Sequence, residues 1–224
     1  MHAKNFIHKV VFKKFEIKKM ISSSPFSFVY EGINLINNTP VALKMEKEKL
    51  FNHLESEAFT LMNLKGYGIP QLISYGKRGS YNILIEELLG PNIEFLWEKY
   101  GFKKELSVKN NITLKDICLI AIQILERLQY IHDKDMIHCD IKPKNFVIGR
   151  NNPKIIYLID FGLAKKFRSS KTGKHVRFAN KYKLIGTFFF SSCNAIKGYE
   201  LSRRDDLESL GYALLYLANG LWLP

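Results

Sequence analysis

Residues 15–90 contain short stretches in which apolar and polar side chains alternate, separated by turn formers such as Asn37–Pro40. Such alternation, bounded by turn residues, is typical of β-strands with one buried face. A helix is predicted over 54–64 from apolar residues that recur at helical spacing, namely Leu54, Ala58, Leu61 and Met62. This part of the chain is predicted to form one helix and five strands, the strands lying near 15–18, 28–30, 41–44, 71–75 and 81–86.

From Pro91 onward the pattern becomes mainly helical. The clearest helix is predicted to begin at Thr113, because Asp116 three residues later supplies the second partner of a capping box. A short buried strand is predicted at 155–160 and a further helix at 205–218. The long helix is expected to bury one face and Cys118; that face carries Ile117, Ile120, Ile124, Leu125, Leu128 and Ile131. We predict an α+β chain with a small β-rich part at 15–90 and a larger helical part at 91–224.

The composition narrows the class of protein. Apolar residues make up 46% of the chain and charged residues 25%, which excludes a disordered or fibrous chain. No apolar run reaches the about 18 residues that a membrane span needs, and the start lacks the apolar core of a secretory signal. Cys118, Cys139 and Cys193 are scattered, so they suggest neither a disulfide framework nor a zinc site. We expect a monomeric, cytoplasmic or nuclear protein with no membrane partner.

The chain is strongly basic, with a formal net charge of +13. Such a field favours acidic partners, among them nucleic acid. However, 27 of the basic residues are Lys and only 7 are Arg, whereas Arg is preferred for bidentate reading of phosphates and bases. The Lys surplus is typical of an AT-rich genome, such as that of a eukaryote with a reduced genome or its nucleomorph. No recognised nucleic-acid module is present, so we expect no nucleic-acid partner.

Basic residues also gather locally. The segment 165–183 carries eight Lys or Arg and no acidic residue. A cationic run of this kind is compatible with a solvated loop and with a binding site for acidic substrates, and the pattern alone leaves both open.

Four short motifs follow one another along the chain: Val41–Lys44, then Glu55 on the predicted helix, then His138–Asn145, then Asp160–Gly162. Each is weak alone, but in this order and structural context they match the protein-kinase signature set. Phosphoryl transfer needs a site that holds the triphosphate, neutralises its charge with Mg²⁺ and aims a hydroxyl in line. Lys44 is predicted to contact the phosphates of ATP, and Glu55 to orient Lys44. Asp140 is predicted to be the catalytic base, with Lys142 in contact with the transferred phosphate. Asn145 and Asp160 are predicted to bind Mg²⁺.

The sequence resembles one particular family within the protein kinases. The runs Gly66–Pro70, Leu88–Pro91, Leu158–Lys166 and above all Leu201–Tyr212 resemble the casein kinase 1 family. The resemblance covers the chain from about Phe15 to its last residue. It implies a bilobal kinase fold with a truncated large lobe, and a serine/threonine kinase that uses ATP and Mg²⁺ on acidic proteins.

The resemblance also implies where the nucleotide binds. Adenine is expected at a hinge over Glu87–Leu89, between Val29 and Ala42 on one side and Val147 on the other, with Ile21 at the edge of the site. Asp206 is expected to brace the catalytic loop from its helix.

Several positions depart from the family pattern. The glycines of the phosphate-covering loop are replaced by serines at Ser22, Ser24 and Ser27, which removes the conformational freedom that glycine provides. Cys139 stands where many kinases have Arg, and Phe189 where the family has an Arg that recognises acidic substrates. Glu86 stands at the normally apolar position behind adenine and needs a partner such as Lys44, in competition with Glu55.

These departures keep a second function open. With altered glycines, Glu86 and a chain that ends soon after the 205–218 helix, a pseudokinase that serves as a nucleotide-binding or interaction scaffold is the alternative. The complete set of catalytic side chains favours the active enzyme.

Overall fold

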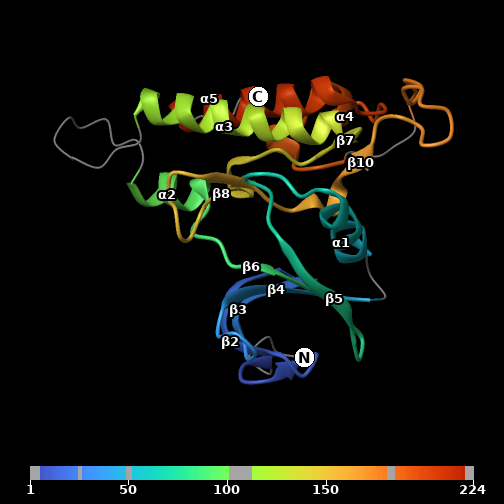
Figure 1. Ribbon diagram of the computed structural model, residues 1–224. Helices are drawn as coiled ribbons and strands as arrows, with labels where there is room; N and C mark the ends of the chain where they lie inside the picture. The colour runs from blue at the N-terminus through green and yellow to red at the C-terminus, as the bar shows by residue number, and fades with distance from the viewer. Residues whose placement is uncertain (1–5, 25–26, 49–51, 101–112, 181–184, 220–224) are drawn as a thin grey trace. The chain divides into compact units, whose positions relative to one another are not determined.

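The computed structural model describes residues 6–24, 27–48, 52–100, 113–180 and 185–219. It divides into two compact units, the first comprising Met1–Lys65 and Pro70–Leu89, the second Gly66–Ile69 and Gly90–Pro224. The first holds a six-stranded sheet and one helix, and the second is mainly helical (Figure 1). The predicted α+β class is confirmed. Pro25 and Phe26 of the serine-containing loop, Lys181 and Lys183 of the basic segment, and the chain end at 220–224 lie outside the described residues.

The sheet of the first unit is antiparallel, in the order β1-β2-β3-β4-β6-β5. Each predicted strand overlaps one of its members, although the one predicted at 71–75 starts one residue before β5, and the sequence pattern missed the two-residue edge strand β1. The bounds are β1 (Val10–Val11), β2 (Phe15–Ser23), β3 (Ser27–Asn34), β4 (Pro40–Lys47), β5 (Leu72–Arg78) and β6 (Tyr81–Glu87).

The two faces of this sheet have different chemistry. Because side chains alternate along a strand, Val41, Leu43 and Met45 of β4 share one face. That face is an apolar core, completed by buried residues of the neighbouring strands. The opposite face carries Lys44 and packs against α1 (His53–Asn63). The polar face is therefore the one that offers functional groups.

Helix α1 turns one stripe toward the sheet. Its buried residues are Leu54, Glu57, Ala58, Thr60 and Leu61. Met62, expected in this stripe, is 62% exposed, because it lies one position and about 100° beyond Leu61 on the helix.

The second unit is built around two long helices that pack on each other, α3 (Leu114–Asp133) and α5 (Arg203–Asn219) (Figure 1). Shorter elements lie before α3 and between the two helices in the chain, and they carry the loops described below. None of the helices in the described ranges has the length and apolar character needed to cross a membrane. The shorter elements are α2 (Ile93–Tyr100), β7 (Met136–Ile137), β8 (Phe146–Ile148), β9 (Ile156–Leu158), β10 (Lys165–Lys166), α4 (Cys193–Ile196) and 3₁₀ turns at Pro143–Asn145, Phe161–Leu163 and Phe188–Phe190.

The buried face of α3 is narrower than predicted. Five of the six expected isoleucines and leucines are buried, but Leu125 is 45% exposed. Cys118 is also exposed, contrary to the prediction. The buried stripe instead includes Arg127, whose Nε donates to the carbonyl oxygen of Ile156 at 3.2 Å. Both errors concern residues one position away from a buried isoleucine.

The N-terminus of α3 has the predicted capping box. The Thr113 hydroxyl accepts a hydrogen bond from the Asp116 backbone N–H at 3.2 Å, and the Asp116 carboxylate accepts one from the Thr113 N–H at 2.8 Å. Replacing an N-cap threonine by alanine costs about 1 kcal/mol. Thr113→Ala should therefore lower the free energy of unfolding by about 1 kcal/mol in urea titrations, whereas Thr113→Ser should retain most of it. Equal stability of the alanine variant and the wild type would contradict this role.

Candidate functional site

Lys44 lies at the centre of the polar face of the first unit. Its ammonium is 2.7 Å from Oε1 of Glu57 on α1 and 3.0 Å from Oε1 of Glu86 on β6. The side chains are largely buried, with exposures of 13% for Lys44, 1% for Glu57 and 5% for Glu86. One ammonium is thus shared by two carboxylates in a place with little access to water.

The helix partner of Lys44 is Glu57, and the prediction of Glu55 was wrong. Glu55 lies on the exposed side of α1, whereas Glu57 is in the buried stripe. A signal for this was present in the sequence. Glu57 is three residues after Leu54 and four before Leu61, so it shares their face, while Glu55 is rotated away from it.

Glu86 pairs with Lys44, as one expectation from the sequence had it. The second oxygen of Glu86, Oε2, is buried and has no hydrogen-bond partner within the part of the chain that the structure describes. An unsatisfied buried carboxylate oxygen is costly, so the contact with Lys44 is the main compensation for burying Glu86.

The predicted hinge follows directly after Glu86. The Glu87 carboxylate accepts a hydrogen bond from the backbone N–H of Gln71 at 2.9 Å, which holds the end of β6 beside the start of β5. Burial raises the pKa of Glu87 and the charge of Glu86 adds to the effect, while the hydrogen bond from Gln71 opposes it. Leu89 is half-buried.

The residues predicted to contact adenine belong to both units. In the first unit, Ala42 is buried on β4, Val29 is half-buried on β3, and Ile21 is 52% exposed on β2. Val147 is buried on β8 of the second unit, where it pairs with Tyr157 of β9. The contact of these residues with adenine stays a prediction.

Two of the serines that replace glycine, Ser24 and Ser27, are hydrogen-bonded to each other. The hydroxyls of Ser24 and Ser27 lie 2.8 Å apart, and the Ser27 N–H donates to the Ser24 hydroxyl at 3.0 Å. Ser22 is exposed at the end of β2. Short hydroxyl side chains here supply hydrogen bonds within the loop itself.

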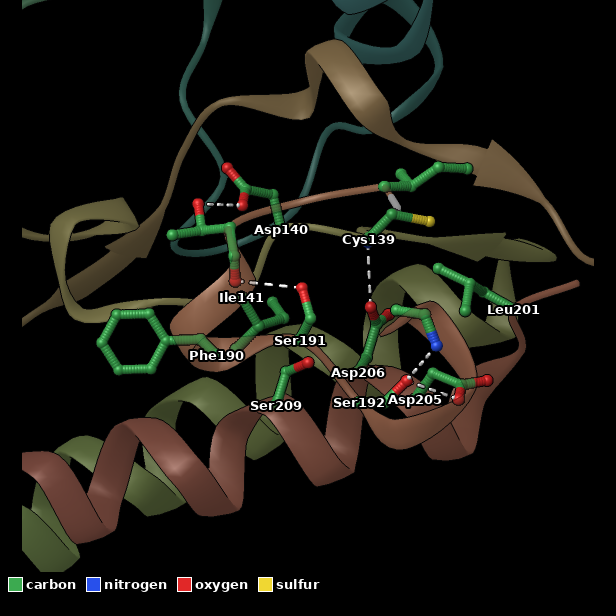
Figure 2. A pocket seen from close by; sticks show the side chains of 13 residues that line it. Cys139, Asp140, Ile141, Phe190, Ser191, Ser192, Leu201, Asp205, Asp206 and Ser209 are labelled. Carbon is green, nitrogen blue, oxygen red and sulfur yellow. Dashed lines mark hydrogen bonds between the residues drawn. The ribbon is translucent and has the colours of Figure 1, made fainter. Parts of the chain in front are cut away.

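The catalytic-loop motif of the second unit is held by Asp206 of α5. The Asp206 carboxylate accepts hydrogen bonds from the backbone N–H groups of His138 and Cys139, both at 2.9 Å, and lies 2.9 Å from Nε2 of His132. Figure 2 shows Asp206 reaching from its helix to the backbone of Cys139. The prediction that Asp206 braces this loop is confirmed.

Asp140 projects from this braced loop and is 8% exposed. Its Oδ2 accepts a hydrogen bond from the Lys142 ammonium at 2.5 Å, and its Oδ1 accepts one from the Thr187 hydroxyl at 2.8 Å. Lys142 also donates to the Thr187 oxygen at 2.9 Å, which closes a triangle. Burial alone would raise the pKa of Asp140, but the charge and hydrogen bond of Lys142 and the hydrogen bond from Thr187 outweigh it, so the net pKa is lowered.

A glycine lets Thr187 reach Asp140. Gly186 has φ of +92°, and a Cβ at this position would lie 2.6 Å from the carbonyl oxygen of Cys139. Any larger residue would push the segment off the catalytic loop, because the neighbour is backbone and cannot rotate away. Gly186 therefore allows the Thr187 hydroxyl to lie within hydrogen-bond distance of Asp140.

The lowered pKa of Asp140 predicts how Thr187→Val changes stability with pH. A carboxyl whose folded pKa is depressed stabilises the fold above its unfolded pKa of about 3.9, and this is lost as the pH falls through the folded pKa. Thr187→Val removes one bond to the charged form, so we expect a larger loss of unfolding free energy at pH 7 than at pH 3. Urea titrations at both values test this, with Thr187→Ser as control. A pH-independent loss would contradict it.

The predicted metal ligands, Asn145 and Asp160, lie at one end of the β8–β9 hairpin. Phe146 pairs with Leu158, so Asn145, just before β8, and Asp160, after β9, flank the same end. The Ile159 N–H donates to the Asn145 carbonyl oxygen at 3.1 Å, which fastens the two segments together. A carboxylate and an amide oxygen suit Mg²⁺, which keeps several waters and binds substrate phosphates. These residues fit the ion.

His138 has a structural role. It is fully buried, its Nε2 lies 3.0 Å from the carbonyl oxygen of Ile159, and its ring packs edge-on against Phe161 with centroids 5.0 Å apart. The histidine thus ties the catalytic loop to the segment that carries Asp160.

Cys139 occupies a position where many kinases have Arg, and its neighbours are apolar. It packs against the cluster of Ile137, Phe167, Ala195 and Leu201. Burial, followed by the charge of Asp206, raises the pKa of its thiol well above the ordinary value, so it stays protonated. Its φ of +67° is unusual for a residue with a Cβ, and the hydrogen bond to Asp206 holds it there.

Comparison with known proteins decides the family. Residues 15–223 match the model of the protein kinase domain. The chain belongs to the protein kinase family. It is also 40% identical over 211 residues to the Casein kinase I homolog RAG8 of Kluyveromyces lactis, an alignment that covers 92% of this chain and 38% of that protein. The predicted membership of the casein kinase 1 family is confirmed, and the kinase spans less than two thirds of the length of this relative.

Proposed function

We propose that this chain is an active serine/threonine protein kinase of the casein kinase 1 type, which transfers the γ-phosphoryl group of ATP to protein hydroxyls. The observation that carries the proposal is the buried Asp140, kept ionised by Lys142 and Thr187 on a loop braced by Asp206. A positioned, ionised carboxylate beside an ammonium is what a catalytic base in phosphoryl transfer needs.

The proposed reaction assigns each group one task. The substrate hydroxyl oxygen bonds to the γ-phosphorus while the bond from that phosphorus to the leaving oxygen of ADP breaks. Asp140 accepts the hydroxyl proton, and Lys142, 2.5 Å from its Oδ2, places positive charge beside the transferred group. Lys44 contacts the phosphates and is oriented by Glu57. Mg²⁺, held through Asn145 and Asp160, would neutralise phosphate charge when bound.

We further propose that the substrates are acidic proteins. Among the described residues of the basic segment, five cations are exposed, whereas Lys165 is engaged with Glu200 at 2.6 Å. One of these exposed cations, Arg168, lies 3.3 Å from Oδ1 of Asp135. Exposed cations favour acidic peptides through long-range attraction. Phe189, which is 55% exposed, occupies the position where the family has an Arg that recognises acidic substrates. We therefore assign the recognition of acidic substrate residues to the basic segment 165–183. The exposed cations are Lys166, Arg168, Lys171, Lys174 and Arg177.

A phosphorylation assay with Mg-ATP separates this enzyme from the pseudokinase alternative. Wild-type protein should phosphorylate casein or an acidic Ser/Thr peptide, whereas Asp140→Asn and Lys44→Ala should not. Incorporation that survives in Asp140→Asn would reveal a contaminating kinase. A wild type that transfers nothing but is stabilised by Mg-ATP would establish the scaffold function instead.

The substrate preference has its own test. Acidic peptides should be phosphorylated faster than basic ones at low salt, and the margin should shrink as salt screens the charges. Equal rates for acidic and basic peptides at low salt would refute the preference. The monomeric state and the cytoplasmic or nuclear location stay predictions from the sequence.

A further inference from the structure

Lys44 has more negative charge around it than it can neutralise. Its single ammonium contacts Glu57 at 2.7 Å and Glu86 at 3.0 Å. All three side chains belong to the first unit and are shielded from water, so their interactions are screened far less than those of surface charges. An anion that approaches Lys44 is therefore repelled by two carboxylates.

The two carboxylates are held in different ways. Glu57 comes from α1, whereas Glu86 and Lys44 come from neighbouring strands of one sheet. In the register of β4 and β6, Glu86 pairs with Ala42 and Lys44 with Leu84, so Glu86 lies diagonally next to Lys44 on the same face. The Glu86 contact is part of the sheet and does not depend on the position of a helix.

Glu86 also depends on Lys44. Its Oε1 meets the ammonium, and its Oε2 is buried without a hydrogen-bond partner among the described residues. If Lys44 turned toward a phosphate, Glu86 would lose its main compensation for burial. Moving the ammonium from Glu86 to a nucleotide therefore has a cost that an apolar residue at this position would not impose.

We propose that Glu86 is a positioning residue that restrains Lys44 and weakens the binding of nucleotide phosphates. This inference rests on the proposed function, because it takes Lys44 as the phosphate-contacting group. It predicts that removing the charge of Glu86 strengthens nucleotide binding. The effect should act through Lys44 and through phosphate, since the contact between Glu86 and Lys44 is what opposes the ligand.

The test compares wild type with Glu86→Gln and Glu86→Met, two neutral replacements of similar length. Both should lower the KM and the Kd for Mg-ATP about tenfold, the effect of one charge-assisted contact, with a smaller change in kcat. The Kd for adenosine, which has no phosphates, should stay within about twofold. In a Lys44→Met background, Glu86→Gln should no longer change the Kd for Mg-ATP.

Glu46→Gln is the matched control. Glu46 is a buried glutamate on β4, on the same face as Lys44, and its Oε2 lies 3.9 Å from Nδ1 of His53. Its removal tests the general effect of deleting a buried carboxylate from this face, and nucleotide affinity should stay unchanged. Thermal unfolding of each variant shows whether it is folded, and either of the two Glu86 variants suffices for the comparison.

The outcomes separate the inference from the proposed function. If wild type binds Mg-ATP and transfers phosphate but the Glu86 variants bind no tighter, only the inference is overturned. Equal tightening of ATP and adenosine, or tightening that persists without Lys44, also overturns it, because Glu86 would then act on the base or on the fold. If neither wild type nor the Glu86 variants bind Mg-ATP, both the inference and the proposed function are overturned. Binding gained only in the variants supports the inference and refutes an active wild type.

Discussion

Asp140→Asn should reduce phosphoryl transfer about 100- to 10,000-fold, the range for loss of a positioned general base. The reason is the arrangement of Asp140, whose two oxygens accept hydrogen bonds from Lys142 and Thr187 and whose pKa is lowered. An amide has nearly the same shape but cannot accept the hydroxyl proton. The measurement is kcat with Mg-ATP and an acidic peptide. Stabilisation by Mg-ATP should persist, since the ligands predicted for the nucleotide and metal are unchanged.

Asp133→Asn is the control for this variant. Asp133 is an exposed aspartate at the end of α3, so its loss changes the net charge equally without touching the catalytic loop. Activity of Asp133→Asn should match that of wild type. Full activity of a purified Asp140→Asn protein, or equal loss in both variants, would exclude Asp140 as the base.

Glu57→Gln should produce the second large effect, a fall in kcat/KM of about 10- to 100-fold. Without the Glu57 charge, Lys44 keeps its contact with Glu86, which restrains it, and loses the partner that orients it from α1. Removing one member of a buried ion pair also lowers the unfolding free energy, by about 3–5 kcal/mol when the partner is left alone and by less here because Glu86 still pairs with Lys44.

Glu55→Gln is the matched control on the same helix. Glu55 lies two residues from Glu57 but on the exposed side of α1, so both kcat/KM and unfolding free energy should stay near wild type, the latter within about 0.5 kcal/mol. Steady-state kinetics and urea titrations of the two variants decide between the glutamates. A large loss for Glu55→Gln with none for Glu57→Gln would reverse the assignment made from the structure.

The residues of the catalytic-loop motif could be assigned together from the sequence because they are close in sequence. Asp140, Lys142 and Asn145 lie within one short loop, and Asn145 bonds back to Asp140 at 2.8 Å. Contacts of this kind depend on local backbone geometry, which a short motif specifies. The capping box at Thr113 was predictable for the same reason, since its two partners are three residues apart.

Residues that differ by one or two helical positions were harder to assign. Each residue along a helix turns the side chain by about 100°, so Glu55 and Glu57 point to different sides of α1 although both fit a loosely drawn motif. Leu125 and Cys118 were misplaced on α3 in the same way, each lying next to a buried isoleucine. Which of several adjacent residues is buried depends on what packs against the helix.

The amino-acid sequence by itself predicted the kinase family, five strands of the sheet and the three long helices, and it suggested catalytic roles for residues of the 138–145 motif, because these follow from local patterns and contiguous motifs. Only the tertiary structure decided that Lys44 is shared by Glu57 and Glu86 and that Thr187 completes the bonding of Asp140. These contacts join residues that are far apart along the chain. They depend on strand register, on the rotation of α1 about its axis, and on a glycine that lets one backbone approach another.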